Sequence, residues 1–307
     1  MDLRQNVLTT TLSELRIRDP FILPDEATGT YILTGTIDRP EGSRPGVSIL
    51  TSRDLVTWEG PTSIFDVPDD FWGGTLVWAP ELHAYHGKYY LFVTFTSDEK
   101  LANQWPKWPA LVERGTQILV ADSPMGPFQP FHNRAHLPAD QMTLDGTLWV
   151  EDGVPYMIYC HEWVQVWDGA ICSIRLADDL SETVGESSVL FHATHAPWTP
   201  EGRKGYVTDG PFFYRTSGDK LLMIWSSFSD DGYTTGIAVS QTGTLAGPWV
   251  HQPEPLISMG GGHGMICRSF DGTLMLSLHQ PNGRSRERAR LFELEDTGET
   301  IRIKAAR

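Results

Sequence analysis

Three aspartates occupy similar places along this chain, each in a short polar cluster just before an apolar segment: Asp19, Asp145 and Asp209. A fourth carboxylate, Glu162, follows an apolar segment and stands beside His161. When carboxyl groups are buried together, each raises the pKa of the others. Carboxyls with separated pKa values can act as general acid and general base, as hydrolysis of a glycosidic bond requires. An aspartate before glycine or proline often only caps a turn, but its recurrence at one repeat position favours a shared site.

The clusters that hold the aspartates recur five times, at intervals of roughly 60 residues, a period typical of propellers and other repeat proteins. They are Arg18-Asp19-Pro20, Ala79-Pro80-Glu81, Leu144-Asp145-Gly146, Thr208-Asp209-Gly210 and Gly262-His263-Gly264. Each cluster leads into an apolar run that turns at a glycine and returns as a second run, and a third run follows. Four of the units carry a candidate fourth strand, and four-stranded units repeated around an axis are propeller blades. We predict an all-β fold, a five-bladed β-propeller, as a single catalytic domain over residues 1–307.

This topology brings the polar residues together. The innermost strand of each blade starts at one end of the central channel, and the second strand returns to that end. The residues at these places are polar or aromatic: Asp19, Asp145, Asp209, His263, His161, Glu162, Trp163 and Phe228. Aromatic faces at such places can stack on sugar rings, so we predict that His161, Trp163 and Phe228 contact the substrate.

The charge of the chain limits its partners. The formal net charge is −15, and no long run of lysine or arginine occurs. Nucleic acids and anionic membrane surfaces need an electropositive face. We therefore expect no nucleic acid and no membrane as partner, and a neutral or cationic ligand instead.

The cysteines and the N-terminus bear on location. Cys160, Cys172 and Cys267 lie in apolar runs without metal-ligand spacing, which predicts buried thiols. Their odd number mildly favours the cytoplasm. Residues 1–19 lack the apolar segment of a signal peptide, and no stretch reaches the ~20 apolar residues that cross a bilayer. We expect a cytoplasmic protein from the chain as given, or a secreted one if a signal peptide has been removed.

In its five clusters the chain resembles glycoside hydrolase family 43, and the resemblance covers nearly the whole chain. The residues that carry it are Arg18-Asp19-Pro20-Phe21-Ile22, Trp78-Ala79-Pro80-Glu81, Leu144-Asp145-Gly146, Asp209-Gly210-Pro211-Phe212 and Gly262-His263-Gly264. Members of that family are five-bladed propellers that hydrolyse arabinofuranosyl and xylosyl linkages with inversion. The resemblance therefore implies this fold and this reaction.

The resemblance also implies roles for individual residues. Asp19 would be the general base that activates water, and Asp145 would orient the acid and adjust its pKa. Trp78 would line the sugar subsite. His263 would stand near the axis, where some members hold a calcium or another ion through water, so it is the candidate metal residue. Hydrolysis requires no organic cofactor.

The fourth blade departs from the family pattern, which usually has Glu-Gly-Pro where this chain has Asp209-Gly210-Pro211. Asp209, one methylene shorter than glutamate, is the first candidate for the general acid. Glu162 is the second candidate. The third alternative is a site that binds sugar but hydrolyses it poorly or not at all.

Two longer connections, residues 98–115 and 192–203, could wall the channel and so favour an exo-acting pocket. We predict release of a terminal pentose from an oligosaccharide or a polysaccharide side chain, with α-L-arabinofuranoside ahead of β-D-xyloside. The alternatives are another furanosidase, such as a β-D-galactofuranosidase, and a carbohydrate-binding propeller without turnover.

Overall fold

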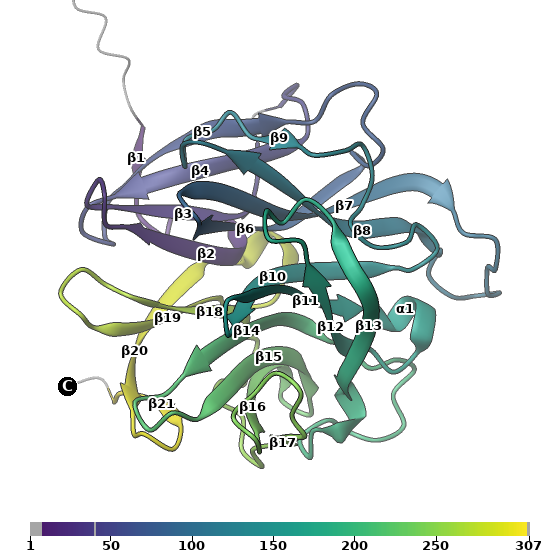
Figure 1. The fold of residues 1–307 in the computed structure, drawn as a ribbon. Coiled ribbons are helices and arrows are strands. Elements are labelled where there is room, and N and C mark those ends of the chain that lie inside the picture. Colours follow the sequence, from purple (N-terminus) through teal and green to yellow (C-terminus); the bar gives the residue numbers. More distant parts are fainter. Residues whose placement is uncertain (1–7, 40, 306–307) are drawn as a thin grey trace, which may run out of the picture.

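The computed structural model describes residues 8–39 and 41–305, and it forms five antiparallel sheets around a central axis (Figure 1). Each sheet is built from strands that follow one another in the chain, and the first sheet gains the short N-terminal strand β1 at its outer edge. The fifth sheet lies beside the first, so that the ring closes. The predicted all-β, five-bladed propeller is confirmed.

Apart from β1, which lies at the outer edge of the first blade, the strands of each blade follow one another outward from the axis in chain order. The first blade contains β1 (Thr9–Thr10), β2 (Ile17–Asp25), β3 (Thr30–Ile37), β4 (Gly46–Ser52) and β5 (Trp58–Asp66). The second contains β6 (Leu76–Tyr85), β7 (Lys88–Lys100), β8 (Val112–Ala121) and β9 (Gln129–Pro130). The third contains β10 (Thr143–Glu151), β11 (Val154–His161), β12 (Ala170–Leu176) and β13 (Thr183–His192).

The remaining two blades follow the same plan. The fourth contains β14 (Asp209–Arg215), β15 (Leu221–Ser229), β16 (Gly232–Ser240) and β17 (Trp249–His251). The fifth contains β18 (Gly262–Arg268), β19 (Leu274–His279), β20 (Ala289–Asp296) and β21 (Ile301–Ile303). The helical segments are α1 (Trp163–Val166) and two 3₁₀ turns, Ala193–His195 and Arg284–Arg286. None of the helices in the described ranges is long and apolar enough to cross a membrane. The predicted location of the protein stays a prediction.

The core lies between neighbouring blades. Each sheet packs one face against the sheet before it in the ring and the other face against the sheet after it. Leu91 and Phe95 of the second blade, for example, share a buried cluster with Ile32 of the first. Met265 of the fifth blade packs in the same way with Ile17 of the first. The three cysteines are free and buried, as predicted.

Every innermost strand carries a β-bulge near its start, where the register shifts. The bulge holds one residue at positive φ in each blade: Asp19 at 53°, Ala79 at 44°, Asp145 at 55°, Gly210 at 49° and His263 at 51°. A bulge of this kind turns a side chain out of the regular alternation of the strand. Positive φ is uncommon for residues other than glycine, and such strain clusters at functional sites.

The bulges correct one alignment expected from the sequence. Asp19 and Asp145 share the positive-φ position, but in the fourth blade that position belongs to Gly210. Asp209 lies one residue earlier and is therefore equivalent to Arg18 and not to Asp19. The acidic residue does not recur three times at one repeat position.

Candidate active site

One cavity of about 460 Å³ gathers nearly all of the predicted site residues. The predicted residues in its lining are Asp19, Trp78, Asp145, Glu162, Trp163, Asp209, Phe228 and His263. They come from all five blades, so that side chains far apart in the sequence meet at the end of the channel where the innermost strands begin.

Asp19 is a buried carboxylate surrounded by basic groups. Its Oδ1 lies 3.2 Å from His263 Nδ1 and 3.3 Å from Arg18 Nε, and its Oδ2 accepts a hydrogen bond of 3.1 Å from the Thr36 hydroxyl. Burial acts to raise the pKa of Asp19, but His263 and Arg18 outweigh it and hold the pKa well below the usual range. Oδ1 is buried, accepts no hydrogen bond from the described residues, and also lies 3.4 Å from His279 Nδ1.

Asp145 contacts residues that neighbour both of the other two aspartates. Its Oδ2 accepts a 3.1 Å hydrogen bond from the Gly210 amide and lies 3.4 Å from His263 Nδ1. Burial, together with the charge of Asp19, raises its pKa well above the usual value. Through Gly210, Asp145 contacts the backbone beside Asp209.

Asp209 accepts a 2.8 Å hydrogen bond at Oδ2 from the Tyr233 hydroxyl. Burial and the nearby Asp145 raise the pKa of Asp209 to about 7, although Arg18 and His263 oppose the shift. A carboxyl with this pKa carries its proton in a large fraction of molecules at neutral pH. Asp19 and Asp209 therefore line one cavity with pKa values shifted in opposite directions.

Glu162 is buried and forms an ion pair with Arg114 Nη1 at 2.5 Å. Burial raises its pKa, while Arg114 acts to lower it. Arg114 also donates a 2.9 Å hydrogen bond to Thr96 Oγ1 and lies over the Trp78 ring, 4.5 Å from its centroid. Glu162 is thus tied to the second blade by a positioned guanidinium.

Aromatic side chains form the apolar part of the lining. Besides Trp78, the Trp163 ring packs against the backbone at Gly205, where an added Cβ would lie 2.1 Å from a ring carbon. Phe228 lies 5.2 Å from Tyr233 between ring centroids. Such faces suit the apolar side of a sugar ring.

Other lining residues were not assigned a role from the sequence: Arg16, Arg18, Thr36, Leu144, Val207, Tyr233, Asn282 and Glu287. Tyr233 comes from the third strand of its blade, and the glycine at position 262 makes room for it, since an added Cβ there would lie 2.2 Å from its ring. In the sequence, Gly262 could have indicated that a large side chain packs at this position, but it does not identify Tyr233 as that side chain.

Two expectations about the surroundings are not met. His161 lies outside the cavity lining because its Nε2 pairs with Gln165 Oε1 at 2.8 Å. Residues 98–115 and 192–203 contribute no lining residue either. Trp198 packs on Trp225 at 5.0 Å, and Arg203, at the end of the same connection, lies over the ring of the lining residue Phe228, 5.1 Å from its centroid.

No group of three or more His, Cys, Asp or Glu side chains within residues 8–39 and 41–305 is placed to hold a metal ion. His263 Nδ1 faces the carboxylates of Asp19 and Asp145. The calcium expected beside His263, held through water, stays a prediction.

Residues 9–304 match the family described as Glycosyl hydrolases family 43. The chain belongs to glycosyl hydrolase family 43. The predicted family is confirmed, and its members are inverting glycoside hydrolases that act on carbohydrates.

Among solved structures, this family 43 chain is similar to the endo-arabinase from Bacteroides thetaiotaomicron, with 41% identity and a TM-score of 0.83 over 94% of this chain and 98% of that one. It is 27% identical to Alpha-L-arabinofuranosidase 43 of Humicola insolens over 69% of this chain and 44% of that protein. It is 25% identical to the Extracellular exo-alpha-(1->5)-L-arabinofuranosidase of Streptomyces avermitilis over 86% of this chain and 54% of that protein. The chain thus spans about half the length of these two curated relatives.

Proposed function

We propose that this family 43 protein is an inverting hydrolase of α-L-arabinofuranosyl linkages. The observation that carries the proposal is the pair Asp19 and Asp209, which line one cavity and have pKa values shifted in opposite directions, well below the usual range for Asp19 and up to about 7 for Asp209. The sugar is supported by the three relatives, because each is named for arabinose.

The proposed reaction uses one water molecule. Asp19 takes a proton from the water whose oxygen attacks the anomeric carbon, and the bond to the glycosidic oxygen breaks. Asp209 donates its proton to that leaving oxygen. Asp145 positions the acid through the Gly210 amide. Both carboxyls then return to their starting states by proton exchange with solvent.

Glu162 has a different role in this proposal. Its ion pair with Arg114 favours the charged form and fixes the side chain beside a guanidinium that itself lies over Trp78. We assign it to binding a sugar hydroxyl, together with Trp78, Trp163 and Phe228 along the apolar lining. Within the described part of the chain, Asp209 has no such cationic partner at hydrogen-bond distance, so it is the better proton donor.

Exo action on a terminal arabinose is the first candidate, supported by the relative from Streptomyces avermitilis. Endo action is the second candidate, and the 41% identity to the Bacteroides thetaiotaomicron endo-arabinase favours it. The products from linear α-1,5-arabinan separate the two: free arabinose from the start for exo action, and mixed oligosaccharides for endo action.

The test of the proposal is hydrolysis of 4-nitrophenyl α-L-arabinofuranoside, β-D-xyloside and β-D-galactofuranoside by the wild type and by Asp19→Ala. We expect turnover of the arabinofuranoside, reduced at least ~100-fold in the variant because the general base is lost. If the enzyme prefers another glycoside of the panel, the sugar of that glycoside replaces α-L-arabinofuranose in the proposal. Sugar binding without any turnover would establish a carbohydrate-binding propeller instead.

A further inference from the structure

Three tryptophans form a row that leads away from the cavity, and we call them the tryptophan ridge: Trp163, Trp108 and Trp105. Trp163 lines the cavity itself. Trp108 lies 5.5 Å from Trp163 and 5.7 Å from Trp105 between ring centroids. Trp105, at the far end, is 42% exposed. The ridge thus runs continuously from the sugar site to the surface.

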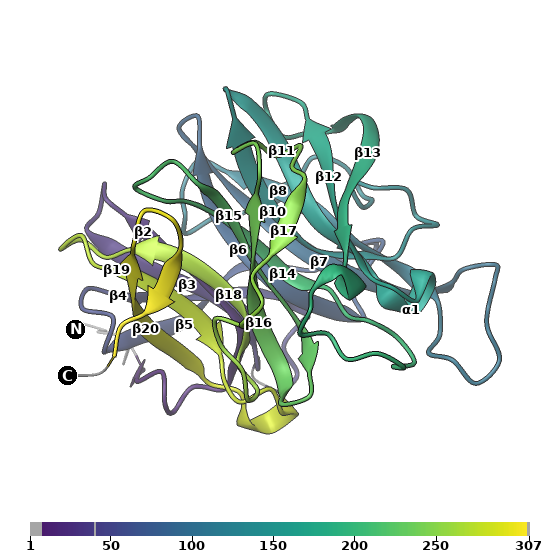
Figure 2. The ribbon, with the colours of Figure 1, turned by 90° about the horizontal axis from the view of Figure 1, so that it is seen from below.

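The ridge is held by its own loop, residues 101–111, which projects beside α1 on one side of the propeller in both ribbon views (Figures 1 and 2). Trp108 Nε1 donates a 2.6 Å hydrogen bond to the Val164 carbonyl of α1. Gln104 Nε2 donates to the Leu101 and Leu111 carbonyls, and Gln104 Oε1 accepts from the Leu111 amide. These bonds close the neck of the loop and present Trp105 in a defined position.

A second hollow, of about 590 Å³, lies between this loop and α1. Its lining consists of Ala102, Asn103, Gln104, Trp105, Leu111 and Gln165. An indole and an amide together suit a sugar chain, because the Trp105 indole can stack on a C–H face and the Asn103 amide can hydrogen-bond hydroxyls, whereas the Gln104 and Gln165 amides hold the loop and α1. Lys107 is the single charged residue of loop 101–111, so nothing in the loop selects for a polyanion.

We propose that the tryptophan ridge and this hollow bind the part of a neutral arabinan chain that extends beyond the bond being cut. The inference rests on the proposed function, since Trp163 joins the ridge to the cavity where the terminal sugar would sit. It also assigns a role to the long connection in the second blade, which does not wall the cavity.

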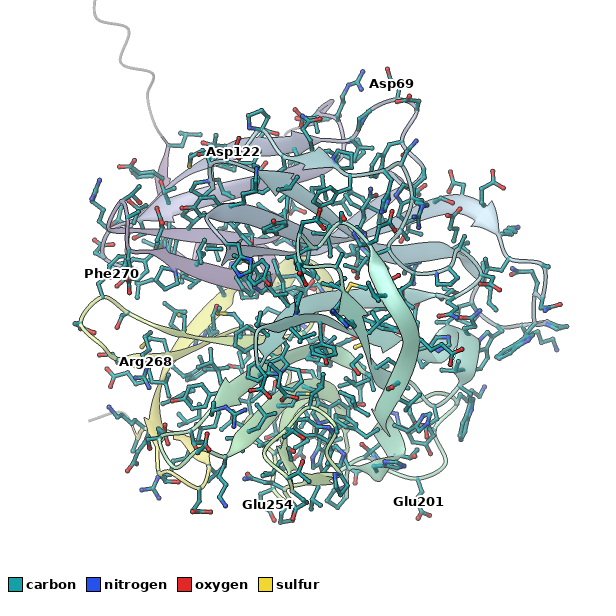
Figure 3. The ribbon with its side chains drawn as sticks, viewed as in Figure 1. Asp69, Asp122, Glu201, Glu254, Arg268 and Phe270 are labelled. Atoms are coloured by element: carbon teal, nitrogen blue, oxygen red, sulfur yellow. The ribbon has the colours of Figure 1, made fainter. Side chains whose placement is uncertain are left out.

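The test compares Trp105→Ala with Phe270→Ala, an exposed aromatic control. Phe270 is 43% exposed and lies on the β18–β19 hairpin, at the opposite edge of the molecule from the loop (Figure 3). Each variant is assayed on 4-nitrophenyl α-L-arabinofuranoside and on linear α-1,5-arabinohexaose. Loss of one stacking contact should lower the ratio of kcat/KM for the hexaose to kcat/KM for the aryl glycoside about five- to tenfold in Trp105→Ala, mainly through KM. The ratio should stay at the wild-type value in Phe270→Ala.

A binding measurement separates this inference from the proposed function. Arabinohexaose is titrated by calorimetry into Asp19→Ala and into the double variant Asp19→Ala/Trp105→Ala, and the double variant should bind five- to tenfold more weakly. Equal binding by the two proteins, with an unchanged kinetic ratio, would show that the tryptophan ridge does not bind the arabinan chain. The proposed arabinofuranosidase activity would not be affected by that result. If the wild type neither cleaves nor binds any arabinose compound, both proposals fail together.

Discussion

Asp19 and Asp209 are both buried in one cavity, yet their pKa values move in opposite directions because their neighbours differ. His263 and Arg18 lie within 3.3 Å of Asp19 Oδ1. Asp209 receives only the neutral Tyr233 hydroxyl at hydrogen-bond distance and experiences the charge of Asp145. Local charge therefore separates two chemically identical side chains into base and acid.

The pH dependence of kcat/KM tests this assignment at the level of single residues. Because Asp209 must hold its proton to act, and its pKa is raised to about 7, activity should fall as the pH rises through about 7. Asp209→Asn should lower kcat by about 100-fold or more on a poor leaving group, and it should remove this alkaline limb. An aryl glycoside with an activated leaving group should restore much of the rate.

Glu162→Gln is the matched variant, since it changes the other candidate acid without altering its size. It should keep the alkaline limb and weaken substrate binding instead. If the limb disappears in Glu162→Gln and persists in Asp209→Asn, Glu162 is the acid and the proposed assignment is wrong.

At the scale of the element, the bulge at the start of each innermost strand sets the direction of the site residues. In the fourth blade, glycine holds the bulge position because His263 of the next blade crowds it. A Cβ on Gly210 would lie 2.6 Å from His263 Cδ2 and 2.9 Å from His263 Cα. The bulges of two neighbouring blades are thus packed directly against each other.

We predict that Gly210→Ala impairs catalysis by displacing His263 from Asp19 and Asp145. Gly153→Ala is the control, because Gly153 also has positive φ, at 78°, but an added Cβ there meets nothing within 4 Å. Both variants should lose roughly 1 kcal/mol of unfolding free energy through backbone strain, and Gly210→Ala should lose more, because its Cβ also meets the His263 backbone. Only Gly210→Ala should lose kcat, measured beside urea unfolding. Equal kcat in the two variants would show that the contact with His263 has no part in catalysis.

At the scale of the whole molecule, the ring closes by contacts between the last and first blades, and these blades exchange no strand within residues 8–39 and 41–305. Glu287, which is 1% exposed, lies at this junction. Its carboxylate lies 3.4 Å from Arg16 Nε and 3.6 Å from Arg18 Nη1, and its carbonyl accepts a hydrogen bond from the Ile17 amide. A buried acid thus adds ion pairs to the apolar contacts that close this junction.

Glu287→Ala should destabilise the ring, because it removes the buried carboxylate shared by Arg16 and Arg18, which then keep their pairs with Asp38 and Asp19. We expect a loss of about 3 kcal/mol in the free energy of unfolding by urea. Glu182→Ala provides the comparison: its pair with Arg134 at 2.8 Å is half exposed, and its removal should change stability by less than about 1 kcal/mol. Similar losses in the two variants would mean that closure does not depend on Glu287.

Much of this architecture could be predicted from the sequence because its signals are local. The five clusters and the apolar runs after them recur along the chain, and the period alone implies blades around an axis. Once the blades are assumed, topology places Asp19, Asp145 and His263 at one end of the channel, as the structure confirms.

Only the tertiary structure decided which side chains pair with which. His161 is hydrogen-bonded to Gln165, and Glu162 pairs with Arg114 of another blade. Asp209 accepts a hydrogen bond from Tyr233. The loops 98–115 and 192–203 are long in the sequence, but their direction depends on packing against α1 and Trp225. Strand periodicity and turns are determined by residues that are neighbours in the sequence. The pKa values and the cavity walls depend on atoms that folding brings close from distant parts of the chain. That physical difference explains why the fold and the candidate residues were readable from the sequence, while the protonation states and the extent of the binding surface were not.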